Sequence, residues 1–182
     1  MKTDKKIILW AAGFLILLSF ILLQLDIYPI TLTSKWIITS RQFNKVVASS
    51  FVYYQKTFSV YATSTPISNI EFQKEIKRAA LDKLIEDKIT EKVLRKILGA
   101  KELEKLVNDK LANLPINDEI AKASQILYNL SLEDFKKLVL IPQAKTEILK
   151  ERGIDLLEIK KSYQPIILIP EFYWQNEVLT RD

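Results

Sequence analysis

The side chains that most often carry catalysis or bind metals are missing from this chain, which contains neither histidine nor cysteine. Imidazole general bases, thiolate nucleophiles, disulfides and ordinary zinc sites are therefore excluded. The chemistry left open is a pair of carboxylates, a serine activated by a lysine, or a cation held by carboxylates. The chain has three glycines, too few and too scattered for a glycine-rich phosphate loop. We expect neither a metal nor a cofactor.

Acidic residues are sequence neighbours at three places, residues 86–87, 118–119 and 133–134. On a helix adjacent residues diverge by about 100°, so such a pair does not converge on one substrate atom. A helix surface or helix start explains these pairs better than acid-base catalysis. Serine-lysine chemistry would need Ser49, Ser50 or Ser124 beside a buried lysine, and nothing in the sequence places one there. We expect no catalytic residues and no enzyme.

An uncharged apolar run occupies residues 7–25, directly behind three lysines. At about 1.5 Å of rise per residue, a helix of this length spans roughly 28 Å, which matches the hydrocarbon core of a bilayer. Because lysines are retained on the cytoplasmic side, we expect a cytoplasmic tail at residues 1–6 and an extracytoplasmic domain at residues 26–182. A cleaved signal peptide is the alternative, but no pattern of small residues follows the run. The sequence predicts a single-pass signal anchor in the lipid bilayer.

The remainder of the chain, residues 26–182, has a length that suits one compact domain. Removing the three lysines and one aspartate of the N-terminal tail from the net charge of +5 leaves +3, which is nearly balanced. Lysines and glutamates alternate along the helical segments as on a solvated surface, whereas nucleic-acid binders gather basic residues on one face. We expect no nucleic-acid partner.

The spacing of apolar residues predicts a mainly α domain. The longest helix starts at a capping box, Ser68-Asn69-Ile70-Glu71, and ends at Gly99. Its predicted apolar stripe consists of Phe72, Ile76, Ala80, Leu84, Ile89, Val93 and Ile97. Pro142 is expected to kink or interrupt the last helix. Helices are expected over residues 41–56, 69–98, 103–114, 117–129 and 131–152, with a loop at residues 57–67.

Two extended segments lie at the two ends of the domain. Residues 30–37 are rich in β-branched side chains, and residues 163–174 combine two prolines with an isoleucine run that opposes a helix. Pairing the two segments would satisfy the backbone hydrogen-bonding groups of both. We therefore predict a small strand pair formed by the two ends of the domain.

This order of elements resembles the N-terminal domain of SurA- and PrsA-type extracytoplasmic chaperones. The stretches that carry the resemblance are LDKLIEDK at residues 81–88 with Gly99 after it, NDEI at 117–120 and LSLEDF at 130–135. It covers residues 30–153 and leaves an extended tail at 154–182. The first strand lacks the family's Asn-Gly turn, and residues 53–67 look like an insertion.

Many members of that family continue into a parvulin-type prolyl isomerase domain, which needs histidines and glycine-rich loops. This chain has neither, and its tail is too short for such a domain. The resemblance therefore implies a SurA-N-like helical domain without isomerase activity.

Our leading hypothesis is a membrane-anchored, non-catalytic chaperone or holdase that binds unfolded or exported polypeptides. Aromatic side chains in or beside a loop can contact varied peptides, although packing in the core would also account for them. The alternative is a structural or adaptor subunit of a membrane-associated assembly, docked through the long helix at residues 69–98. The candidate peptide-binding residues are Phe51, Tyr53, Tyr54, Phe58 and Tyr61.

Overall fold

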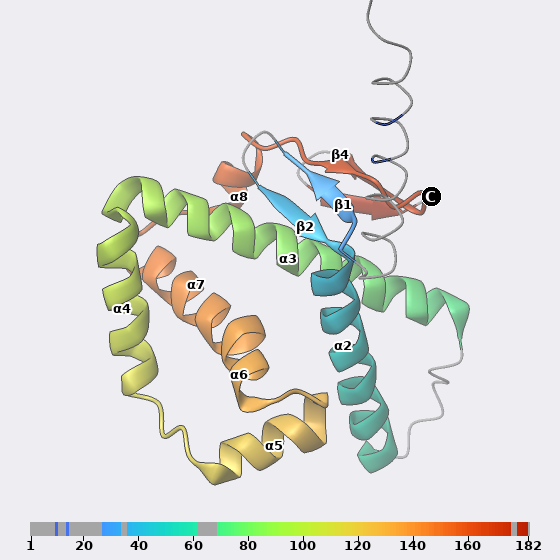
Figure 1. Ribbon diagram of the computed structural model, residues 1–182, viewed down its shortest axis with the longest axis horizontal. Helices are drawn as coiled ribbons and strands as arrows, with labels where there is room; N and C mark the ends of the chain where they lie inside the picture. The colour runs from blue at the N-terminus through green and yellow to red at the C-terminus, as the bar shows by residue number, and fades with distance from the viewer. Residues whose placement is uncertain are drawn as a thin grey trace, which may run out of the picture.

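The computed structural model describes residues 27–33, 36–61, 69–175 and 178–181, together with Trp10 and Phe14. The described part is mainly helical, as predicted, and contains two small antiparallel sheets where a single strand pair was predicted (Figure 1). Its elements are β1 (Pro29–Leu32), β2 (Ile37–Thr39), α2 (Ser40–Tyr61), α3 (Ile70–Leu98), α4 (Ala100–Ala112), α5 (Asp118–Tyr128), α6 (Leu132–Phe135), the π-helical turn η1 (Lys136–Leu140), α7 (Ile141–Glu151), α8 (Leu156–Lys160), β3 (Ile166–Ile167), β4 (Phe172–Gln175) and β5 (Val178–Arg181).

The predicted tail at residues 1–6 and the predicted anchor at residues 7–25 lie outside the described residues, apart from Trp10 and Phe14. Among the helices that the structure does describe, none combines the length and the apolar character needed to cross a bilayer.

Helix α3 crosses the domain and packs against α2, α4, α7, α8 and β5 (Figure 1). Its N-cap is Asn69, whose side chain accepts a hydrogen bond from the backbone N–H of Glu71, so the predicted capping box headed by the preceding serine is wrong. Gly99 ends the helix at a positive φ of 80°, which a residue without Cβ adopts without strain.

The buried face of α3 differs in part from the predicted apolar stripe. Leu81 and Ile85 are fully buried although the stripe omitted them, whereas Ile97 is exposed. The stripe advanced mostly in steps of four residues, and because an α-helix has 3.6 residues per turn, such steps drift around the helix. The buried residues of α3 are Ile76, Ala80, Leu81, Ile85, Ile89, Thr90 and Leu94.

The first sheet has the strand order β2-β1-β3 and joins the two ends of the domain. β1 pairs antiparallel with β3, which confirms the predicted pairing of the ends. The single strand predicted at residues 30–37 is wrong, because β1 and β2 form a hairpin. Its turn is closed by the Thr33 N–H donating to the Trp36 carbonyl and by the Trp36 N–H donating to Thr33 Oγ1, each at 3.0 Å.

The tail at residues 154–182 is also more structured than predicted. It contains the short helix α8, and its last two strands, β4 and β5, pair with each other as a second antiparallel sheet. Phe172 and Leu179 of this hairpin are buried against α3 and the first sheet. The tail therefore completes the core.

Two buried clusters of apolar side chains lie along α3. One joins the sheets to α2 and α3, and the other joins α3, α4 and α7. Val93 and Leu156 pack against both clusters, so the two are continuous. The first contains Ile30, Ile38, Phe43, Ala80, Leu81, Ile85, Ile89, Phe172 and Leu179; the second contains Leu94, Leu103, Val107, Ala144, Ile148 and Leu149.

Pro142 does not break its helix; a widened turn precedes it. In η1 the N–H of Ile141 donates to the carbonyl of Lys136, five residues back. A wider turn makes room for the proline ring, which in a regular α-helix presses against the carbonyl four residues earlier. The wider turn also changes the direction in which the side chains of Leu138 and Val139 project from the helix.

Candidate functional site

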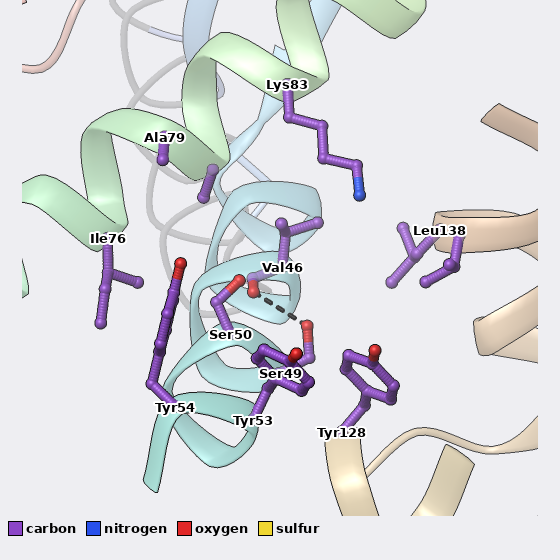
Figure 2. Close-up of a pocket in the computed structure, with 12 residues that line it drawn as sticks. Val46, Ser49, Ser50, Tyr53, Tyr54, Ile76, Ala79, Lys83, Tyr128 and Leu138 are labelled. Atoms are coloured by element: carbon purple, nitrogen blue, oxygen red, sulfur yellow. Dashed lines mark hydrogen bonds between the residues drawn. The ribbon is translucent and has the colours of Figure 1, made fainter. Parts of the chain in front are cut away.

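A cleft of about 260 Å³ lies between α2, α3, α5 and η1 (Figure 2). Its two long walls are one face of α2 and one face of α3, in each case residues spaced three and four apart, which share a side of a helix. The lining residues are Val46, Ser49, Ser50, Tyr53 and Tyr54 from α2, Ile76, Ala79, Ala80 and Lys83 from α3, Tyr128 from α5, and Leu138 and Val139 from η1.

The cleft exists because small side chains occupy the middle of both walls. Ser49 and Ser50 on α2 lie across from Ala79 and Ala80 on α3, where larger residues would fill the space between the helices. Ser49 is buried, and its hydroxyl donates to the Val46 carbonyl at 2.9 Å. The hydrogen bond of the Ser49 hydroxyl is therefore made within α2, and this part of the wall offers a ligand no unpaired donor from Ser49.

Aromatic rings form the lower border of the cleft and continue beyond it. Tyr53 stacks on Tyr128 with ring centroids 5.2 Å apart and planes at 5°. Tyr54 meets Phe72 edge-on at 5.4 Å, and each such pair contributes about 0.5–1.5 kcal/mol beyond its buried area. We call the connected set the aromatic series: Phe72, Phe58, Tyr54, Tyr53, Tyr128 and Phe135.

These rings are partly exposed to solvent, and the phenol of Tyr128 is neutral. Tyr53 and Tyr54 are each 37% exposed. Burial raises the pKa of Tyr128, and the adjacent Tyr53 hydroxyl raises it further, so the phenol stays neutral and can both donate and accept hydrogen bonds. Lys83 reaches from α3 into the open space opposite Leu138 (Figure 2). The cleft thus combines rings, aliphatic side chains, hydroxyls and one ammonium group.

The predicted site residues are only partly brought together. Tyr53 and Tyr54 line the cleft, and Phe58 belongs to the aromatic series beside it. Phe51 is half-buried and does not line the cleft. Tyr61 is the last residue of α2, and its side chain lies outside the described residues. The loop predicted from residue 57 is wrong as far as Tyr61, because α2 continues through it, and residues 62–68 are not described.

Sequence reasoning missed the far side of the cleft. Tyr128 falls in the helix predicted at residues 117–129, but no local pattern places it against Tyr53. Leu138 and Val139 fall in the helix predicted at residues 131–152, and no local pattern places them beside a cleft. Their place in the cleft depends on the packing of α5 and η1 against α2 and α3, which pattern alone does not specify.

Several of the serines and acidic residues with catalytic potential make structural contacts. The Ser124 hydroxyl donates to the carbonyls of Ala121 and Leu130, at 2.9 and 3.3 Å. Glu86 bonds to Lys160 and its neighbour Asp87 bonds to Lys145, so this acidic pair diverges as predicted. Within the described residues, no group of three or more acidic side chains is arranged to hold a metal ion.

Comparison of the chain with protein-family models, with curated proteins and with solved structures finds no match. The resemblance to SurA- and PrsA-type N-terminal domains therefore stays a prediction. Function has to be inferred from the geometry and chemistry of the cleft.

Proposed function

We propose that this chain is a membrane-anchored, non-catalytic extracytoplasmic chaperone of the holdase type, which binds unfolded or exported polypeptides in the cleft. The observation that carries the proposal is an open hollow bordered by stacked, partly exposed tyrosines. Aromatic rings offer a large contact area with few rotatable bonds, so they can cover varied apolar segments at low entropic cost. Hydroxyls at the same border can bond to the backbone of a bound chain.

The apolar run at residues 7–25 supplies the second part of the proposal. A single membrane span with its lysine-rich tail in the cytoplasm would hold the cleft on the side where exported chains emerge. Tethering raises the local concentration of the cleft near its clients without adding any contact to them. A weak, adaptable binding site would then be sufficient.

The adaptor alternative requires an uncovered apolar face on the long helix. The buried residues of α3 instead pack within the domain, against the sheets, α2 and α7. Among the described residues of α3, the strongly exposed aliphatic ones are Ile70 and Ile97, near opposite ends of the helix. Two separated side chains do not form a docking stripe, so the geometry favours the cleft.

A binding measurement with the full chain in lipid nanodiscs tests the proposal. The probe is a permanently unfolded, fluorescently labelled polypeptide, and Ala79→Leu fills the cleft from the α3 side. We expect its affinity to fall by about tenfold or more, which corresponds to about 1.4 kcal/mol. Ala112→Leu, at the exposed end of α4, is the matched control and should bind like the wild type.

A second pair of variants compares two tyrosines of similar exposure. Tyr54 borders the cleft and is 37% exposed, whereas Tyr173 lies on β4 and is 39% exposed. Tyr54→Ala should weaken polypeptide binding and Tyr173→Ala should not. Equal affinities for all four variants, together with one stoichiometric partner co-purifying with the full chain, would replace the holdase with the adaptor.

A further inference from the structure

The three-stranded sheet carries a row of apolar side chains on its outer face. Leu32 of β1 pairs with Ile37 of β2 and with Ile166 of β3. Directly paired residues place their side chains on the same face about 5 Å apart, so the three form one row across the sheet. Ile37 is 52% exposed, Ile166 is 61% exposed, and Leu168, two residues further on, is 46% exposed. We call Leu32, Ile37, Ile166 and Leu168 the apolar row.

The opposite face of the same strands packs against the core. Thr31 pairs with Ile38 and Ile167, one position along from the apolar row. Thr31 and Ile38 are completely buried, and Ile38 belongs to the core that includes α3. A register irregularity between Pro29 and Thr31 lets the neighbouring Ile30 reach the core as well. From Thr31 onward side chains alternate between the two faces of the strand, so the burial of Thr31 and Ile38 directs the apolar row outward.

The sheet begins very close to the proposed membrane anchor. Residues 26–28 alone separate the end of the apolar run at residue 25 from Pro29, where β1 starts. A chain extends at most about 3.5 Å per residue, so β1 starts within about 14 Å of the end of the run. The polar layer on each side of a bilayer is about 5–8 Å thick. A longer connection would let the domain move away from the surface, but this one keeps the sheet beside the headgroups.

We propose that the apolar row docks on the bilayer surface and holds the domain in one orientation against the membrane. The occupant of this face is the interfacial layer of the lipid, in which exposed aliphatic and aromatic side chains are stabilised. Tyr28, which is 39% exposed and immediately precedes β1, lies at the right position to join the contact. The proposal rests on the anchor within the proposed function and is independent of what binds in the cleft.

Docking through this face would set the position of the cleft. α2 starts at the end of β2 and leads away from the sheet (Figure 1). At about 1.5 Å of rise per residue, the α2 residues that line the cleft lie roughly 10–20 Å further along the helix. The cleft would then be held at a fixed height, beyond the headgroups, where it can receive a chain.

Spin labelling tests the docking directly, because a chain without cysteine takes a single label at any introduced cysteine. The variants are Ile37→Cys and Ile166→Cys in the full chain, in nanodiscs of phosphatidylcholine and phosphatidylglycerol. Ile126→Cys on α5 is the matched control, since Ile126 is 60% exposed. Collisions with membrane-soluble oxygen and with a water-soluble nickel complex report where each label lies.

We expect the oxygen-to-nickel collision ratio at positions 37 and 166 to exceed the ratio at position 126 several-fold. Equal ratios at all three positions, with the protein still floating with lipid, would overturn the docking and leave the anchor intact. Failure of the protein to float with lipid at all would overturn the anchor as well. Dipolar broadening at position 166 that grows with the number of chains per disc would show that a second copy covers the row instead.

Discussion

The two halves of α3 are held by opposite kinds of contact. Residues 72–80 meet the rings of the aromatic series and border the cleft. Residues 82–91 carry four carboxylates that hold two buried lysines from other helices, which we call the lysine clamps. Lys160 lies 2.8 Å from Glu86, and Lys145 lies 2.9 Å from Glu91. The first stretch contributes rings and small side chains to the cleft, and the second contributes charged contacts to α7 and α8.

The two kinds of contact differ in how much rearrangement of the helices they tolerate. A buried ammonium group is stable only while its carboxylates keep their distance and direction, so each clamp permits one arrangement of its helices. Stacked rings tolerate offsets and tilts at little cost, and small side chains beside them leave room for movement. Rigidity at the clamps would therefore let the cleft adjust to the different occupants that we propose for it, while the rest of the domain keeps its arrangement.

The largest expected effect comes from breaking a clamp. Lys160 is 3% exposed, bonds to Asp82 and Glu86, and lies 5.5 Å from the Trp174 ring centroid. Lys160→Met keeps the volume but removes the charge, and we expect it to lower the free energy of unfolding by about 2 kcal/mol, less than for fully buried pairs because both carboxylates retain contact with water. Urea unfolding of the full chain in detergent, followed by tryptophan fluorescence, measures the change.

Two controls separate charge from packing in the clamp. Adding Asp82→Asn and Glu86→Gln to Lys160→Met should recover most of the loss, because no carboxylate is then left without its partner. Lys101→Met, at an exposed position on α4, should change the free energy of unfolding by less than about 0.5 kcal/mol. A neutral Lys160→Met variant would contradict the clamp.

The pH dependence of the clamp has a defined sign. Burial lowers the pKa of Lys160, but the hydrogen bonds and charges of Glu86 and Asp82 outweigh it, and the net pKa is raised. The stabilisation is therefore complete below the pKa of an unfolded lysine, about 10.4, and is lost as the pH rises through the higher folded value. The stability difference between the wild type and Lys160→Met should persist from pH 6 to 9 and shrink only in strong alkali.

A smaller effect is expected for the aromatic half. Tyr53 and Tyr128 stack across α2 and α5, and a double-mutant cycle of Tyr53→Leu and Tyr128→Leu isolates the energy of that contact. We expect a coupling energy of about 1 kcal/mol in urea unfolding. A coupling energy near zero would mean that the rings touch without stabilising each other, and the contrast with the clamps would then be sharper than proposed.

The smallest effects should come from the two carboxylates of the other clamp, and their signs should differ. Burial raises the pKa of Asp87 more than Lys145 lowers it. Burial also acts to raise the pKa of Glu91, but the hydrogen bonds and charges of Lys145 and Arg95 outweigh it and the net pKa is lowered. At pH 7 we expect Asp87→Asn to be neutral or slightly stabilising and Glu91→Gln to cost about 0.5 kcal/mol.

An acid titration of the same variants checks these signs. The contribution of Glu91 is present above the pKa of an unfolded glutamate, about 4.3, and is lost as the pH falls through the lower folded value. Protonation of Asp87 begins at a higher pH than in the unfolded chain, so acid removes its penalty first. Urea midpoints that shift in the same direction for both variants at pH 7 would show that the two carboxylates are equivalent.

The sequence was most informative where a single side chain sets a local boundary. Asn117 and Ser131, the first residues of two predicted helices, cap those helices by accepting hydrogen bonds from the N–H groups of Ile120 and Asp134. The pairing of the two chain ends was also predictable, because few segments were suited to a strand. A helix cap depends on residues only a few positions apart, and the strand pairing follows from the small number of strand candidates. Neither prediction requires knowledge of how distant segments pack.

Features that depend on packing between distant segments were missed. The β1–β2 turn is closed by the side chain of Thr33 and carries no Asn-Gly signal. Leu127 is exposed although it is apolar, because α5 buries only a narrow face that includes Ser124. The stacking of Tyr53 on Tyr128 likewise depends on how α5 docks on α2, and no local pattern encodes that choice.

The pairing of β1 with β3, from the two ends of the domain, also determines when the first sheet can be completed during synthesis. Strand β1 leaves the ribosome among the first segments of the domain, but its partner β3 emerges only after every helix described between them. Until then β1 has a free edge, which is available to any extended chain nearby. Pairing with β3 would remove this free edge, and it can occur only after the helices between the two strands have been synthesised.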